Sequence, residues 1–283
     1  MDKFSFFNDS FSISKTSSYF LSLQLQSDSY TYAIIDTVTK RFVAVKHETF
    51  DEAMLIKPIG DKLDSMLKND AFLNKHYKSV HFGFVSQKST LVPKVLFDKA
   101  YLKDFFQFNQ NLSDSEELHF NYLKNTGAYN IFAIPSDLTT MLVNRFPEIQ
   151  FYHHATPFIE NALGVALTLK MKMPSIHINV NTEFVDIAGV SGDKMVLYNS
   201  EVYRSIEDIL YHLLNVASQL EMQPAKCYLF ISGDILPKSN AGKTLKRYFP
   251  NVRYTKEMTG AEFSFESVPE HAVSNILNLH QCE

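Results

Sequence analysis

The chain has 283 residues, of which 45% are hydrophobic and 20% are charged, and its formal net charge is −4. This is the composition of a globular protein with room for one large domain or two medium ones. Because the lysines and arginines are dispersed and the chain is slightly acidic, it lacks the basic field that draws proteins to nucleic acid or to anionic membranes.

Targeting and redox features are few. The amino-terminal stretch "MDKFSFFNDSFSISK" has no basic start followed by an apolar segment, and no apolar run approaches the roughly 20 residues that span a bilayer. The two cysteines, Cys227 and Cys282, cannot build a disulfide framework or a four-ligand zinc site. We therefore expect a cytoplasmic protein without a membrane span.

The first part of the chain predicts three strands, a helix and a fourth strand. Alternating leucines in "YFLSLQLQ" and apolar runs elsewhere indicate strands, and apolar residues at helical spacing indicate the helix. The predicted strands are 19–26, 30–36, 41–48 and 79–85, and the predicted helix is 51–68.

The middle of the chain predicts further helices and strands. "SDLTTMLVNRF" indicates a helix with Ser136 as its N-cap. "TPFIENALGVALTLK" indicates a longer helix in which Thr156 caps and Pro157 takes the first helical position. The predicted helices are 97–112, 136–146 and 156–170, and the predicted strands are 117–123, 129–135 and 149–154.

The second half of the chain repeats the order of the first. In its helix, Ser205 and Asp208 stand at the two positions of a capping box before an apolar face. The predicted strands are 175–180, 184–190, 194–203 and 226–232, and the helix is 205–222. Five elements in the same order, at about 19–85 and again at 175–232, indicate an internal duplication.

The tripeptide Gly-Lys-Thr at 242–244 suggests a phosphate-binding loop, but its surroundings do not support one. Such a loop needs a glycine five residues before its own glycine, so that backbone N–H groups curl around a phosphate, and Pro237 stands there. Gly233 is too distant, and too few residues follow to complete such a domain. We interpret the stretch as the start of a surface helix capped by Ser239 or Asn240.

Two tandem β-β-β-α-β units joined by a helix resemble the actin-like ATPase superfamily, whose repeat unit has the ribonuclease-H-like fold. "FAIPSDLTTMLVNRFPEIQFYHHATPFIENALGVAL" is similar to the segment of bacterial pilus- and division-type members that crosses to the second domain. "LSLQLQ", "YAIID", "YNSEVYRSIEDILYHLL" and "LFISGDI" are similar to an uncharacterised bacterial family of about this length.

The resemblance implies an α/β fold of two tandem ribonuclease-H-like domains. Each is expected to hold a mixed sheet flanked by helices. The domains are expected to span 1–155 and 156–283, with the crossing helix at about 156–170.

In active members of that superfamily, ATP lies in the cleft between the domains, and the first hairpin of each domain carries Asp-x-Gly. The aspartates hold hydrated magnesium, and glycine lets the backbone approach the phosphates. This chain departs from the pattern, because its first hairpin carries Gln26 and Asp28 and its second carries Asn179, Asn181 and Thr182. Amides bind magnesium weakly and add no negative charge.

The corner formed by Ser232, Gly233 and Asp234 resembles the loop beside which adenosine lies, with Asp234 where a second glycine is usual. A plain turn after a strand explains the corner equally well, and both interpretations stay open. The resemblance implies a vestigial nucleotide cleft, with ATP and magnesium as the cofactors it would take. Its residues are Gln26, Asp28, Asn179, Asn181, Thr182, Ser232, Gly233 and Asp234.

Three functional hypotheses follow. The first is a degenerate actin-like protein that does not hydrolyse ATP efficiently and is a binding or assembly module for another protein, through its cleft or its surface. The alternative is a divergent ATPase or phosphotransferase that binds Mg-ATP in the cleft. A nuclease of the ribonuclease H type is disfavoured, because no carboxylate cluster could hold two metal ions. No catalytic residue and no metal ligand is assigned.

The remaining candidates carry no catalytic constellation. His153 and His154 are neighbours on a predicted strand, so they point to opposite faces and cannot readily share a metal; we expect them at the surface of the domain boundary. His177 and His212 are expected to be hydrogen-bonded core or rim residues. Glu160 begins the crossing helix and is expected to interact with the helix dipole.

Overall fold

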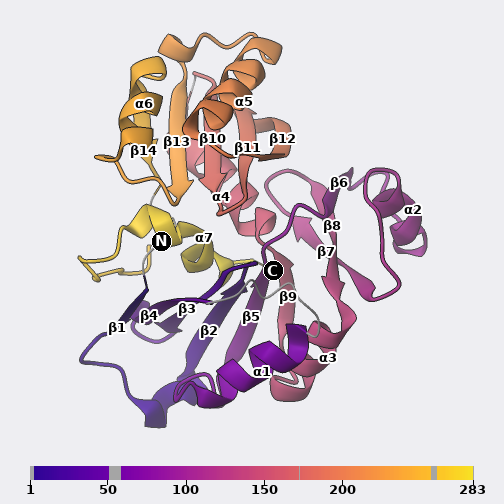
Figure 1. Cartoon of the computed structure of the whole chain (residues 1–283), viewed down its shortest axis with the longest axis vertical. Coiled ribbons are helices and arrows are strands. Elements are labelled where there is room, and N and C mark those ends of the chain that lie inside the picture. Colours follow the sequence, from indigo (N-terminus) through magenta and orange to yellow (C-terminus); the bar gives the residue numbers. More distant parts are fainter. Residues whose placement is uncertain (1–2, 51–58, 172, 256–259, 283) are drawn as a thin grey trace.

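A computed structural model describes residues 3–50, 59–171, 173–255 and 260–282. These residues form two large sheets and one small sheet. In Figure 1 the second large sheet stands at the top with its helices, the first large sheet lies below, and the small sheet projects to the right. Within this described part, no helix is both long enough and apolar enough to cross a bilayer.

The two large sheets share one topology. In each, three antiparallel strands are followed by a fourth strand that runs parallel to the first of them, and one more parallel strand extends the sheet. The first sheet has the order β1 (Phe4–Phe7), β4 (Arg41–Thr49), β3 (Ser29–Asp36), β2 (Tyr19–Leu25), β5 (Ser79–Phe84) and β9 (Gln150–His153). The second has the order β12 (Lys194–Val202), β11 (Phe184–Ser191), β10 (Ser175–Val180), β13 (Tyr228–Gly233) and β14 (Asn251–Tyr254). The predicted α/β duplication is therefore present.

The small sheet is an insertion between β5 and the helix α3 (Ser136–Arg145). Its strands are, in order across the sheet, β6 (Ser89–Pro93), β8 (Ala128–Pro135) and β7 (Glu116–Leu123), and they are antiparallel. The short helix α2 (Leu102–Gln107) packs against β6 and β8.

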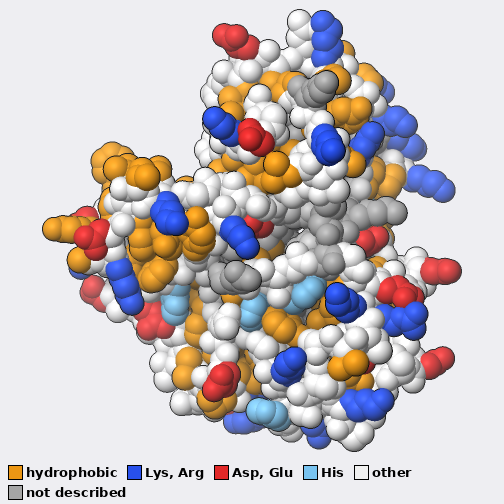
Figure 2. Space-filling view, turned by 180° about the vertical axis from the view of Figure 1, so that it is seen from behind, with side chains coloured by type: hydrophobic (Ala, Val, Ile, Leu, Met, Phe, Trp, Pro, Cys, Tyr) orange, Lys and Arg blue, Asp and Glu red, His pale blue; other side chains and the backbone are white. Residues whose placement is uncertain are grey.

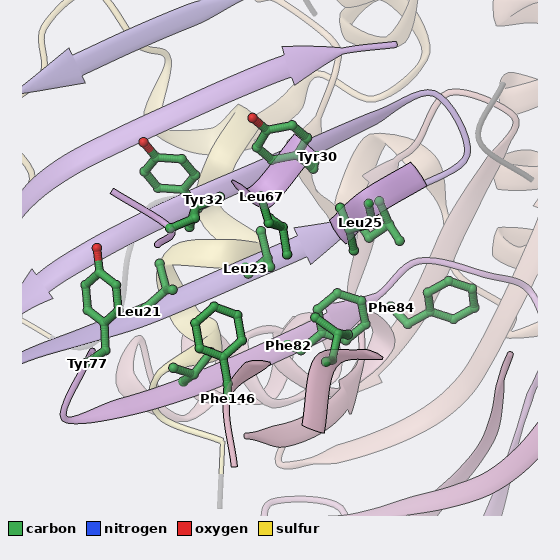
Figure 3. Packing of buried hydrophobic residues seen from close by; sticks show 14 of the residues in the cluster. Leu21, Leu23, Leu25, Tyr30, Tyr32, Leu67, Tyr77, Phe82, Phe84 and Phe146 are labelled. Atoms are coloured by element: carbon green, nitrogen blue, oxygen red, sulfur yellow. The ribbon is translucent and has the colours of Figure 1, made fainter. Parts of the chain in front are cut away.

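Helices cover both faces of the first large sheet. Leu21, Leu23 and Leu25 of β2 point into a core shared with Phe82 and Phe84 of β5, as Figure 3 shows. The alternation of leucines predicted this face. The helices α1 (Ile59–Asn69) and α3 (Ser136–Arg145) close that core, and α7 (Glu270–Leu279) covers the opposite face.

The second sheet is also covered on both faces. On one face α5 (Ile206–Gln219) and α6 (Asn240–Tyr248) bury their apolar residues, and on the other α4 (Ala155–Thr168) packs against β11. The predicted capping box of α5 is confirmed, because the Ser205 hydroxyl accepts from the Asp208 backbone and the Asp208 carboxylate accepts from the Ser205 backbone.

Several expectations differ from the structure. The helix expected over 97–112 is the six-residue α2, and residues 51–58 of another expected helix lie outside the described residues. Helix α3 begins at Ser136 itself, which forms no side-chain cap. Thr156 is the second residue of α4 and not its cap, and its hydroxyl donates to the Asn121 side chain (2.9 Å). The strands β1, β6 and β14 and the helix α7 were not predicted.

Candidate functional site

The two hairpins that the sequence analysis singled out meet across the space between the large sheets. Thr182, in the turn after β10, donates its hydroxyl to Asp28 Oδ2 at 3.0 Å. The Gln26 amide donates to Thr182 Oγ1 at 3.3 Å and to Asp28 Oδ1 at 2.9 Å. The turn after β2 and the turn after β10 are therefore hydrogen-bonded to each other.

This hydrogen-bonded bridge leaves little room in the cleft. Two cavities flank it, one of about 50 Å³ and one of about 160 Å³, and Gln26, Asn181 and Thr182 line both. Ligand pockets usually enclose about 300–1,000 Å³. Both cavities are therefore smaller than a usual ligand pocket.

The electrostatics of the cleft do not favour phosphate. Among the described residues, no lysine or arginine lines either cavity, whereas Asp234 lines one and Glu183 the other. Active phosphate sites stabilise the charge of the phosphates with cations or with clustered N–H groups. The carboxylates here would instead repel a polyphosphate.

Asn179 and Asn181 are not free to bind a metal ion, because they serve a buried carboxylate. Asp186 of β11 is fully buried and accepts from Asn181 Nδ2 at 2.8 Å and from Asn179 Nδ2 at 3.4 Å. The side-chain oxygen of Asn181 accepts from Asn179, and that of Asn179 accepts from the Ser232 hydroxyl. Both amides are therefore used in hydrogen bonds within the second large sheet and the turn after β10.

Asp186 also receives hydrogen bonds from outside the hairpin. His154 Nε2 donates to Asp186 Oδ2 at 2.8 Å, and the Tyr198 hydroxyl donates to Oδ1 at 2.9 Å. Burial alone would raise the pKa of the Asp186 carboxyl, but His154, Asn181 and Tyr198 together hold that pKa below its usual value. The carboxylate is thus kept ionised inside the protein.

The histidine pair is buried, which corrects the expectation of a surface role. His153 and His154 have no exposed area, and His153 packs against Phe132 of β8 whereas His154 packs against Phe184 of β11. His153 Nε2 donates to the Ser86 carbonyl at 2.9 Å, and burial holds the pKa of His153 well below its ordinary value. No cluster of three or more potential metal ligands occurs among the described residues.

Helix α7 is hydrogen-bonded to the segments that follow β9 and β13. The Asn275 amide donates to the His154 carbonyl at 3.0 Å, and His271 Nε2 donates to the Ile235 carbonyl at 3.0 Å. Asp186 therefore lies where β9, α4, α7 and the β10–β11 hairpin meet.

The corner at Ser232, Gly233 and Asp234 has a local structural basis. Gly233 has φ +83°, and a Cβ there would lie 2.2 Å from the Val180 carbonyl oxygen, so the close approach of β13 to β10 requires glycine. The Ser232 hydroxyl is buried and donates to the Ile178 carbonyl at 2.9 Å. Asp234 lines the smaller cleft cavity.

Other sequence features take ordinary positions. Residues 242–244 form part of the first turns of α6, whose cap is the Ser239 hydroxyl accepting from the Gly242 N–H at 3.1 Å. His177 is a buried residue hydrogen-bonded to the Ser175 hydroxyl, and His212 at the surface donates to the Val202 carbonyl. These expectations are confirmed.

Six of the eight predicted cleft residues line the two cavities, and Asp28 joins them through the bridge. Ser232 is the one that points elsewhere. The sequence analysis missed the pair Asp186 and His154. The available signal was Asp186 itself, an acidic residue within an apolar strand, because a buried carboxylate needs hydrogen-bond donors around it.

Residues 8–252 match the model of a family described as "Protein of unknown function (DUF3822)". The chain belongs to this family. No curated protein matches the chain.

Solved structures give the fold of this family member. A Bacteroides thetaiotaomicron protein of actin-like ATPase fold and unknown function is 23% identical, with a TM-score of 0.80, and the similarity covers 96% of this chain and 99% of that one. A chain of the PilM–PilN type IV pilus biogenesis complex is 11% identical, with a TM-score of 0.65, covering 92% and 97%. The ethanolamine utilization protein EutJ from Carboxydothermus hydrogenoformans is 7% identical, with a TM-score of 0.52, covering 94% and 90%. The predicted actin-like ATPase fold is confirmed.

Proposed function

We propose that this protein is a degenerate actin-like protein that does not hydrolyse ATP efficiently and acts as a binding or assembly module for another protein. The observation that carries the proposal is the bridge from Thr182 to Asp28 and Gln26, which occupies the cleft where active members of the fold hold phosphates. The cavities of about 50 and about 160 Å³ beside it leave no nucleotide-sized space.

The chemistry of the cleft supports the same proposal. Phosphoryl transfer relies on magnesium and on groups that stabilise charge on the phosphates. Asn179 and Asn181 are held by Asp186, whose own carboxylate is buried and saturated with donors. If the bridge opened, the amides of Asn179 and Asn181 would still be hydrogen-bonded to Asp186 and would not form a magnesium site.

A surface suited to a protein partner lies on the small sheet. Figure 2, a view from behind, shows hydrophobic side chains gathered on the end of the molecule that the small sheet and α2 form. The exposed apolar residues of this segment are Val95, Leu96, Tyr101 and Phe108, with 90%, 64%, 57% and 87% of their area accessible. Exposed apolar groups of this kind mark contact surfaces. The similar fold in the PilM–PilN complex makes an assembly role for this surface a natural proposal.

Hydrolysis of Mg-ATP by the purified chain tests the proposal. We expect a rate equal to that of buffer for the wild type and for Thr182→Val, which lacks the bridging hydroxyl. The Thr182→Val variant separates two causes, because hydrolysis in that variant alone would mean that closure, and not missing chemistry, prevents activity. Clear hydrolysis by the wild type that is lost in Asp28→Ala would establish the alternative, a divergent ATPase.

A further inference from the structure

A larger cavity than the two in the cleft lies elsewhere in the molecule. It is a groove of about 390 Å³ between α4, the turn that joins β7 and β8, and the end of α7. Its volume falls within the usual range for small-molecule sites. We call it the α4 groove, and the lining residues that matter here are Tyr122, Lys124, Asn125, Glu160 and Gly164.

Glu160 is a carboxylate that lines this groove together with the cationic side chain of Lys124. It is partly buried, and among the described residues it is the one acidic side chain that lines the groove. Its two oxygens share a single donor, the Asn125 backbone N–H, at 3.1 and 3.3 Å. No lysine, arginine or histidine of the described residues forms an ion pair with it.

The partial burial of Glu160 has an electrostatic consequence. Burial raises the pKa of the Glu160 carboxyl, and the Asn125 hydrogen bond and the charge of Lys124 compensate for only part of that effect. A partly buried carboxylate is stabilised by a nearby positive charge or hydrogen-bond donor, because burial removes part of its hydration. The carboxylate retains free lone pairs for a further donor.

Gly164 gives independent support for an open groove. It lies in the interior of α4, where glycine is about 1 kcal/mol less favourable than alanine. A Cβ at this position would meet no atom within 4 Å, and its φ is not in the left-handed region, so neither packing nor backbone geometry requires glycine. The glycine at this position leaves the groove free of a side chain.

We propose that the α4 groove binds a small organic cation, a primary ammonium or guanidinium compound, whose charge pairs with Glu160. Tyr122 and Asn125 line the same groove and would contact the rest of such a molecule, and Lys94 Nζ lies 5.2 Å from the centre of the Tyr122 ring. The α4 groove shares no lining residue with the two cleft cavities, so a test of this site is independent of the proposed function.

Calorimetric titration of the full chain with butylguanidine and, as its neutral counterpart, butylurea tests this site. We expect saturable binding of butylguanidine at millimolar concentration or below, and binding of butylurea that is about tenfold weaker or absent. No saturable binding of butylguanidine, or equal binding of the two compounds, would overturn the proposal.

Two variants locate the binding. Glu160→Gln keeps an oxygen for the Asn125 N–H but loses the charge, and we expect affinity for butylguanidine to fall about tenfold or more. Gly164→Leu adds a side chain to the groove from a position where a Cβ meets no atom within 4 Å, and it should abolish binding while the protein still unfolds at or above the wild-type temperature. The exposed Glu148→Gln is the matched control and should bind normally. Undiminished binding in either groove variant would contradict the assignment.

Discussion

Asp186 shows how one buried carboxylate can organise a junction between two halves of a protein. Four side chains donate to it, those of His154, Asn179, Asn181 and Tyr198. Two of these donors are the amides that stand in the position of a phosphate-loop motif. At the residue scale, Asn179 and Asn181 are part of the hydrogen-bonded framework around Asp186.

Replacing Asp186 by asparagine should be strongly destabilising. An asparagine presents an N–H₂ group to partners that are themselves donors, so at least one buried donor loses its acceptor. We expect the free energy of unfolding to fall by about 3 kcal/mol, as measured by urea denaturation. The exposed Asp114→Asn removes the same charge and should change it by less than about 0.5 kcal/mol. Similar losses in the two variants would argue against a buried role for the Asp186 charge.

Buried histidines predict a loss of stability on acidification. Burial lowers the pKa of His177 to about 3 and that of His81 to about 4. The unfolded chain takes up protons near pH 6.5 that the folded protein does not, so the stabilisation is complete above about pH 6.5 and is lost as the pH falls toward 4. The loss is at most about 1.4 kcal/mol per pH unit for each residue.

Urea denaturation at about pH 7.5 and about pH 5 measures this dependence. We expect lower stability at the acidic pH and a smaller difference between the two for His177→Gln. A pH dependence that is unchanged in this variant would mean that His177 does not titrate as its burial indicates.

Helix α7 is the element that joins the two large sheets. It packs against β13 and α4 on one side and against β2, β3 and β5 on the other (Figure 1). Its buried polar residues include His271, Ser274 and Asn275, so it carries hydrogen bonds as well as apolar contacts into the centre of the molecule. At the element scale, α7 contacts both large sheets and so stabilises the arrangement in which Thr182 is hydrogen-bonded to Asp28.

Two glycines should respond oppositely to alanine. Gly233→Ala would place a methyl group against Val180 at a left-handed backbone position, and we expect a loss of about 3 kcal/mol or more in the free energy of unfolding. Gly164→Ala enters open space within a helix and should raise it by up to about 1 kcal/mol. Urea denaturation of the two variants measures both changes in the free energy of unfolding. A lower free energy of unfolding in Gly164→Ala would contradict the open space seen at this position.

At the scale of the whole molecule, local patterns predicted the duplication well. Alternating leucines, apolar runs and the capping box at Ser205 depend on neighbouring residues, so the order of strands and helices was visible in the sequence. The predicted hairpin residues Gln26, Asn181 and Thr182 line the same two cavities, and their role as a vestigial nucleotide cleft stays a prediction. The division of the chain at residue 155 stays a prediction.

What the sequence could not disclose depends on contacts between distant residues. The bond from His154 to Asp186 spans 32 positions, and the bridge from Asp28 to Thr182 spans 154. The role of α7 arises from its placement between two sheets, which its own apolar pattern does not specify. Burial of His153 and His154 likewise depends on distant residues, Phe132 of the small sheet for His153 and Phe184 and Asp186 of β11 for His154.

Thermal unfolding with and without millimolar Mg-ATP tests the central claim, that the cleft does not bind nucleotide, most directly. A ligand at a hundred times its dissociation constant stabilises the native state by about 2.7 kcal/mol, which raises the unfolding temperature by several degrees. We predict no change in that temperature for the wild type or for Thr182→Val. A rise of several degrees in the wild type would contradict the account and identify a functional nucleotide site.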